Sequence, residues 1–311
     1  KEICSKIFLF ACKTPHTGLG VEVLKTKLNR HHLNLPEKDE DVTCIDRAEI
    51  FRYTTRDAID ICFYTLFKNI TSIDLRYTGV TGDIIHLKSL PNLTGIDLSD
   101  TGVFGDIVHL KSLLNLTEIS LFRTGVTGDI IHLQSLPNLT DICLNHTAVT
   151  GNIEHLKSLP NLTDIRLGGT GVSGDIAHLK SLLNLTNIGL FNTGVTGDIE
   201  NLKSLRNLAH IDLGDTVVTG DIVDLESLLN LTWIDLPETG VTGDIVYLES
   251  LLKLTHIWFA DTAVTGDIKH LKSLRNLTLM DITDTGISGD LEAFKEYRET
   301  AGLSECYLIM T

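Results

Sequence analysis

The 23 residues LTGIDLSDTGVFGDIVHLKSLLN (residues 93–115) set the architecture of the chain, because the same pattern occurs ten times between Ile70 and Glu299. The first residue of each repeat is Ile70 in the first repeat and leucine in the other nine, always 23 residues after the previous one. A fixed period of this size is typical of solenoids, in which every repeat forms one coil. We therefore expect a stack of ten coils.

Two hydrophobic periods divide the repeat, whose positions we number 1 to 23 from Leu93. Apolar residues at positions 4 and 6 alternate with polar neighbours, which predicts a strand with one buried face, whereas those at positions 15, 18 and 21 step by three and predict a short helical or 3₁₀ segment. Glycines at positions 10 and 13 bend the chain between these parts, and the aspartate at position 14, here Asp106, can cap the helical segment. Each coil should therefore contain a strand, a turn and a helical side.

A single coil is too small to fold by itself. Its seven buried aliphatic residues contribute about 2 kcal/mol each, and ordering 23 residues costs about 1.5 kcal/mol per residue. Neighbouring coils must supply the missing apolar contacts and the strand hydrogen bonds. Stability should therefore be cooperative along the stack, and both ends should need caps.

The pattern LxxIxLxxTxVxGDI, as in Leu93–Ile107, resembles the leucine-rich repeat, and its Gly-Asp-Ile resembles the Gly-x-Ile-Pro of the plant-specific class. The resemblance implies an α/β repeat fold: a right-handed solenoid with a parallel β-sheet on its concave face and short 3₁₀ or helical segments on its convex face. It also implies a binding surface. The family's asparagine at position 9 is threonine in all ten repeats, as at Thr101, and no proline follows the isoleucine. A threonine hydroxyl still bonds nearby backbone, so we expect this ladder to survive in weaker form.

We expect one domain with a cap at each end. Residues 1–69 form the N-terminal region and cap, which is predicted to be helical from about residue 42 and to cover the first coil. Residues 70–299 form the ten leucine-rich repeats, and residues 300–311 form a C-terminal cap strand. The pattern of residues 1–41 predicts no function.

Charge and hydropathy exclude two classes of partner. The net charge of −15 and the isoelectric point near 5.1 argue against nucleic acid and against anionic lipid, and no apolar run is long enough for direct membrane insertion. Because the sequence begins with Lys1, we expect a processed or trimmed product. We expect a secreted or cell-surface protein; the alternative is an organelle lumen or a large intracellular assembly.

Cysteines and glycosylation sequons bear on that compartment. Four of the six cysteines lie in the predicted N-terminal cap, where secreted members of the resembling family carry disulfides: Cys4, Cys12, Cys44 and Cys62. Two disulfides with three open pairings, or four buried thiols, fit this pattern. Eight of nine sequons occupy the same scaffold position, 23 or its equivalent, so we expect few to carry glycans: Asn69, Asn92, Asn115, Asn138, Asn161, Asn184, Asn230 and Asn276.

No pattern typical of catalysis, metal binding or cofactor binding stands out. A histidine column at position 17 is spaced by whole coils and does not converge on one point, as zinc requires. The glycine run at residues 168–174 matches a dinucleotide motif, but most of its glycines belong to the scaffold and Asp175 would repel a phosphate. We therefore predict a protein that is not an enzyme and that has no catalytic residues, metal or cofactor.

The outward strand positions 3, 5, 7 and 8 vary between repeats, which is typical of a binding face on a fixed frame. Both tryptophans fall on this face in adjacent coils, and histidines and acidic residues surround them. Aromatic residues with a polar rim are typical of interaction sites. The predicted ligand-binding patch comprises Trp233, Trp258, His210, His256, Asp212, Asp235, Glu238, Asp261 and Phe191.

These observations favour a non-enzymatic recognition module that binds a protein or peptide, which the acidic rim predicts to be basic. Stacked aromatics among carboxylates would also suit a carbohydrate. The alternative hypothesis is a structural or accessory subunit of a larger multi-protein assembly. A hydrolase or lyase on a repeat scaffold is the third hypothesis.

Overall fold

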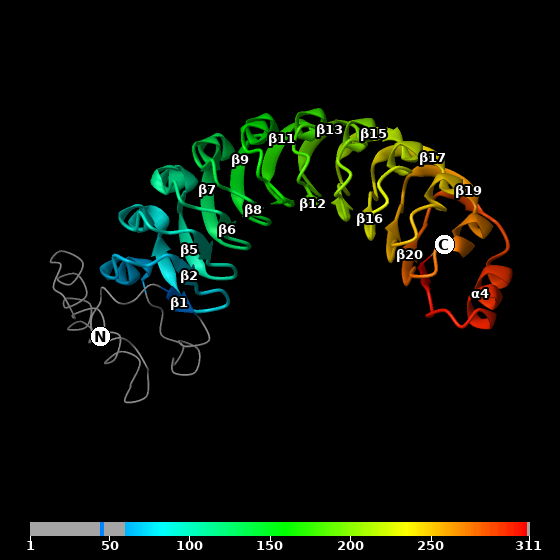
Figure 1. Cartoon of the computed structure of the whole chain (residues 1–311), viewed down its shortest axis with the longest axis horizontal. Helices are drawn as coiled ribbons and strands as arrows, with labels where there is room; N and C mark the ends of the chain where they lie inside the picture. Colours follow the sequence, from blue (N-terminus) through cyan, green and yellow to red (C-terminus); the bar gives the residue numbers. More distant parts are fainter. Residues whose placement is uncertain (1–43, 47–59, 310–311) are drawn as a thin grey trace. The chain divides into compact units, whose positions relative to one another are not determined.

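We describe the chain from a computed structural model, which places residues 44–46 and 60–309. The chain divides into two compact units, residues 1–150 and 151–311. Within each unit the coils repeat the same elements: a three-residue strand, a second strand and a 3₁₀ helix. Within residues 151–311, Figure 1 shows the strands β12, β16 and β20 along the inner side of the stacked coils.

In residues 1–150 the first strands pair in parallel, each with the next along the chain, and form the first sheet: β1 (Cys44–Asp46), β2 (Ser72–Asp74), β4 (Gly95–Asp97), β6 (Glu118–Ser120) and β8 (Asp141–Cys143). The later strands pair likewise and form the second sheet: β3 (Thr81–Asp83), β5 (Gly102–Asp106), β7 (Gly125–Asp129) and β9 (Ala148–Asn152), whose last residues belong to the second unit. The 3₁₀ helices are η2 (Ile61–Leu66), η3 (Ile84–Ser89), η4 (Ile107–Ser112) and η5 (Ile130–Ser135).

In residues 151–311 the strands of the first sheet are β10 (Asp164–Arg166), β12 (Asn187–Gly189), β14 (His210–Asp212), β16 (Trp233–Asp235), β18 (His256–Trp258), β20 (Leu279–Asp281) and β22 (Tyr307–Ile309). Those of the second sheet are β11 (Gly171–Asp175), β13 (Gly194–Asp198), β15 (Val217–Asp221), β17 (Gly240–Asp244), β19 (Ala263–Asp267) and β21 (Gly286–Ser288). The helices are η6 (Ile153–Ser158), η7 (Ile176–Leu179), η8 (Ile199–Leu202), η9 (Ile222–Leu225), η10 (Ile245–Leu248), η11 (Ile268–Ser273) and α4 (Leu291–Thr300).

The core lies between these elements and consists of the apolar repeat positions. In the eighth coil Leu231, Ile234, Leu236, Ile245 and Leu248 have no exposed surface. Strands of the first sheet pair in register, so each position faces the same position of the next coil. This register lines up the outward residues in columns, and it confirms the predicted parallel sheet and 3₁₀ segments.

The second sheet was not predicted, because positions 10 to 14 were expected to form a turn. In β17 the buried Val241 alternates with exposed Gly240 and Thr242, which is a strand of period two with a single apolar residue. Gly243 then takes a φ of 114°, which residues with a side chain rarely adopt. One apolar residue per strand is too weak a signal to separate from a turn.

The predicted caps of the helical segments are confirmed. Asp221 accepts a hydrogen bond of 2.9 Å from the Val223 amide at the start of η9, and the other 3₁₀ helices η2 to η11 begin in the same way. The threonine at position 9 also bonds the backbone: the hydroxyl of Thr239 donates to the Leu236 carbonyl at 2.6 Å. The amide of Asn230 donates to the Arg206 carbonyl of the previous coil at 2.9 Å, so this sequon position belongs to the scaffold.

The N-terminal region differs from the prediction at one point. Residues 44–46, expected within a helical cap, form strand β1 and pair with β2, because an exposed edge of the first sheet leaves backbone groups unpaired. Cys62 on η2 is disulfide-bonded, in agreement with a stapled cap. The predictions for Cys4, Cys12 and residues 47–59 lie outside the described residues.

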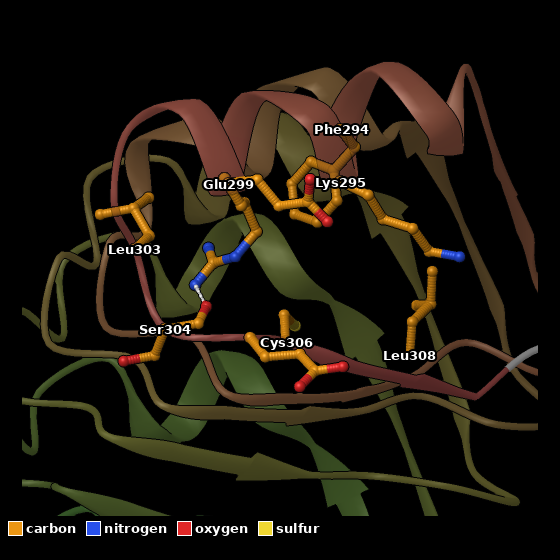
Figure 2. A pocket seen from close by; sticks show the side chains of 9 residues that line it. Phe294, Lys295, Glu299, Leu303, Ser304, Cys306 and Leu308 are labelled. Atoms are coloured by element: carbon orange, nitrogen blue, oxygen red, sulfur yellow. Dashed lines mark hydrogen bonds between the residues drawn. The ribbon is translucent and has the colours of Figure 1, made fainter.

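At the other end, α4 occupies the second half of the tenth repeat, and β22 follows it. Arg298 of α4 is 3% exposed and donates to the carbonyls of Leu274, Leu277 and Ser304 at 3.1, 2.6 and 3.0 Å. Arg298 lines a pocket of about 460 Å³, and Figure 2 shows Phe294 on the helix side and Cys306 across from it in the same lining. This arginine ties α4 to the junction of the ninth and tenth coils and to the segment before β22. Helix α4 crosses the predicted boundary at residue 299, and the three-part division of the chain stays a prediction.

Candidate ligand-binding face

Three rings form a stack on the outward side of the first sheet. His210, Trp233 and His256 begin β14, β16 and β18, and the register makes each the partner of the next. The Trp233 ring centroid lies 5.2 Å from that of His210 and 3.9 Å from that of His256, with interplanar angles of 19° and 22°. All three residues are partly buried, because the histidines cover both faces of the indole. The stack is therefore an aromatic ridge across three strands.

A row of carboxylates runs beside this ridge, two residues further along each strand. Asp212, Asp235, Trp258 and Asp281 are successive register partners, so Trp258 separates Asp235 from Asp281. Burial raises the pKa of Asp212 to about 6, against a hydrogen bond from the Gly214 amide that lowers it. Burial and then repulsion from Asp212 raise the pKa of Asp235 to about 7, although a hydrogen bond from the Trp233 side chain stabilises its charged form.

Exposed acidic residues form a rim where the strands end. Asp215, Glu238 and Asp261 occupy position 8 with φ values of 54°, 52° and 56°, and their amides donate to carbonyls of the following coil at 2.9 to 3.0 Å. These hydrogen bonds hold the bend that turns the acidic side chains outward. Repulsion from Asp215 raises the pKa of Glu238. The rim therefore carries concentrated negative charge.

A polar network borders the ridge on its N-terminal side and was missed by the sequence analysis. Asp164 is 7% exposed, and its Oδ2 accepts hydrogen bonds from Arg166 and from Asn187, whereas its Oδ1 is buried without a hydrogen-bond partner. Burial and then the charge of Arg166 lower the pKa of His210. The available signal was the polar set at position 3 of coils five and six, Asp164 and Asn187, together with Arg166 at position 5 of coil five.

The structure thus brings together eight of the nine predicted patch residues on β14, β16, β18 and the bends after them. Phe191 lies at the N-terminal border of this region. A Cβ atom on Gly168 would lie 2.3 Å from its ring, so this glycine makes room for the ring against the preceding coil. The role of the patch in ligand binding stays a prediction.

One cluster of potential metal ligands occurs among the described residues, near the N-terminal end of the repeats and outside the patch, and it does not form a metal site. Ligand atoms of Asp60, Cys62 and His86 lie within 4.8 Å of one another. Cys62 is disulfide-bonded and offers no thiolate, and the Asp60 carboxylate caps η2 by accepting from the Cys62 amide at 2.8 Å. The two remaining groups, Asp60 and His86, do not make a coordination sphere by themselves.

The solved structures that resemble this chain are repeat proteins of the predicted kind. The plant peptide hormone receptor RGFR1 in complex with RGF2 matches with a TM-score of 0.64 and 21% identity over 80% of this chain and 41% of the receptor chain. The Arabidopsis receptor kinase HAESA, in complex with the peptide hormone IDA and the co-receptor SERK1, matches with a TM-score of 0.65 and 21% identity over 87% of this chain and 50% of that chain. The chain therefore has the leucine-rich-repeat fold.

An internalin from Listeria monocytogenes also matches this chain, with a TM-score of 0.58 and 18% identity over 94% of each chain. The chain spans less than two thirds of the plant receptor chains, and at these identities the likeness shows the fold. No protein-family model and no curated protein matches the sequence. Among the described residues, no helix is long and apolar enough to cross a membrane.

Proposed function

We propose that this leucine-rich-repeat protein is a non-enzymatic recognition module that binds a protein or peptide on the outward face of the first sheet in coils seven to nine. The observation that carries the proposal is the stacked His210–Trp233–His256 ridge beside half-buried carboxylates. Rigid aromatic side chains supply contact area at little entropic cost, and interfaces concentrate their binding energy on such anchors. These residues occupy the positions that vary between repeats, whereas the scaffold positions stay constant, and such variation is what a ligand site on a fixed frame would show.

The solved structures support binding in general. The plant receptors are described in complex with peptide hormones, and leucine-rich-repeat receptor ectodomains and internalins share this fold. We propose by the same likeness that the chain acts outside the cell, as a secreted or cell-surface protein, and the disulfide at Cys62 agrees with an oxidising compartment. A carbohydrate is the second ligand class that stacked aromatics and carboxylates suit.

The test is a pull-down from the source extract with the intact chain and the Trp233→Ala, Trp258→Ala double variant. Phe104→Ala is the matched control, because Phe104 is a 51% exposed aromatic on the second sheet. We expect the double variant to lose one protein or peptide that the intact chain and the control retain, once circular dichroism shows equal folding. Recovery of the same set with all three proteins would contradict the proposal and favour the structural-subunit hypothesis.

A further inference from the structure

We propose that one basic side chain of the ligand, an arginine or a lysine, anchors it at this face by placing its cation against Asp212 and Asp235 beside Trp258. This inference rests on the proposed function and names the chemistry of the ligand. It also makes binding dependent on pH.

The geometry of the pair suits a single cation. Asp212 and Asp235 are register partners on neighbouring parallel strands, which lie about 4.8 Å apart. A planar guanidinium can donate to two carboxylates at this separation. Trp258 is the register partner of Asp235 on the opposite side, which places an aromatic side chain next to the bound cation.

No basic residue of the described part of the chain is among the charged groups that act on Asp235. The charged groups that act on Asp235 from the neighbouring elements are all acidic: Asp212 of β14, Asp215 of the bend after it, and Asp281 of β20. Arg166 is already paired with Asp164 on β10. Burial and mutual repulsion therefore favour proton uptake by Asp212 and Asp235, whose pKa values are about 6 and 7. A bound cation would relieve the same repulsion, so protons and the cation compete.

The two histidines of the ridge reinforce the competition. Burial lowers the pKa of both His210 and His256, so near neutral pH both rings are uncharged and the ridge offers an aromatic surface. The Nδ1 atom of His256 lies 2.7 Å from the Thr255 hydroxyl. Acidification protonates these rings as well as the carboxylates, and each change disfavours a cation. Affinity for a basic group should therefore fall as the pH falls below about 7.

The experiment uses arginine amide as the probe and citrulline amide as its uncharged control, with fluorescence excited selectively in tryptophan as the readout. The protein has two tryptophans, and both lie at this face, so the signal reports on it alone. We expect a saturable response to arginine amide at about pH 8 that weakens by about tenfold or more at about pH 5.5 and in Asp235→Asn. The matched variant Asp97→Asn occupies the same repeat position in the second coil and should respond as the wild type does.

Three results would overturn the inference: no saturable response to arginine amide, an equal response to citrulline amide, or equal affinity at the two pH values. The pull-down separates failure of this inference from failure of the proposed function. A partner that depends on Trp233 and Trp258 but binds Asp235→Asn as well as wild type at both pH values would overturn this inference and leave the proposed function standing. Proton release on titration of arginine amide, measured calorimetrically in two buffers of different ionisation enthalpy, would support the inference directly.

Discussion

Replacing Asp235 with asparagine should stabilise the folded chain near neutral pH. The carboxyl pKa rises from an ordinary value of 3.8 to about 7 in the folded state, because the group is half-buried beside Asp212. The folded state therefore binds the proton more tightly than the unfolded chain does. This stabilisation is present below about pH 4 and is lost as the pH rises through about 7, where the folded protein must hold a charged carboxylate. Asparagine keeps the shape and carries no charge.

The magnitude follows from the shift of about three pKa units, which corresponds to about 4 kcal/mol at 1.36 kcal/mol per unit. Water still reaches part of the carboxylate, and Asp212 shares the shift, so we reduce the expected effect to about 2 kcal/mol. Asp235→Asn should thus exceed wild type by about 2 kcal/mol in free energy of unfolding at about pH 8. The two proteins should be nearly equal at about pH 4.

Urea unfolding followed by tryptophan fluorescence measures this difference, since urea leaves the charges unscreened and both tryptophans lie in the affected coils. Asp97→Asn is the matched control at the same repeat position. Its carboxylate lies 3.4 Å from Arg76, so this substitution should be neutral or cost up to about 1 kcal/mol at about pH 8. A destabilised Asp235→Asn at about pH 8, or a gain of the same size at both pH values, would refute the reasoning.

Three further substitutions test the scaffold. Gly243→Ala should lower the free energy of unfolding by about 2–4 kcal/mol, because the residue has a φ of 114° and a Cβ would lie 2.2 Å from the capping oxygen of Asp221. A loss below about 0.5 kcal/mol in denaturant unfolding would contradict the clash. Thr239→Val should cost about 1–2 kcal/mol, since it leaves the Leu236 carbonyl without its 2.6 Å hydrogen bond, and an unchanged unfolding midpoint would show that this bond contributes nothing. Arg298→Met removes the donor of three carbonyl groups at this end of the chain. Amide hydrogen exchange in β20 and β22 should therefore become about tenfold or more faster, while β14 and β16 keep their protection. An equal change of exchange in all four strands would argue against a local role.

The repeat explains how much of the fold was predictable. Each buried position recurs ten times, so the strand around Ile234 and the 3₁₀ segment after Asp221 were visible as periods and as a cap. The second sheet was not visible, because β17 buries only Val241 and its strand character depends on pairing with β15 and β19. In the N-terminal cap, the pairing of residues 44–46 with β2 was likewise decided by a contact distant in sequence.

The candidate site, like the fold, was predictable from the sequence only in part. The sequence by itself determined which residues share the outward face, because a fixed period and a two-residue alternation assign Trp233, Trp258 and their neighbours to columns. Only the tertiary structure decided that His210 and His256 sandwich Trp233, that Asp212 and Asp235 are buried enough to hold protons near neutral pH, and that Phe191 packs toward the preceding coil. The physical reason is that periodicity fixes the direction of a side chain, whereas rotamers, burial and charge coupling depend on what the adjacent coils place beside it.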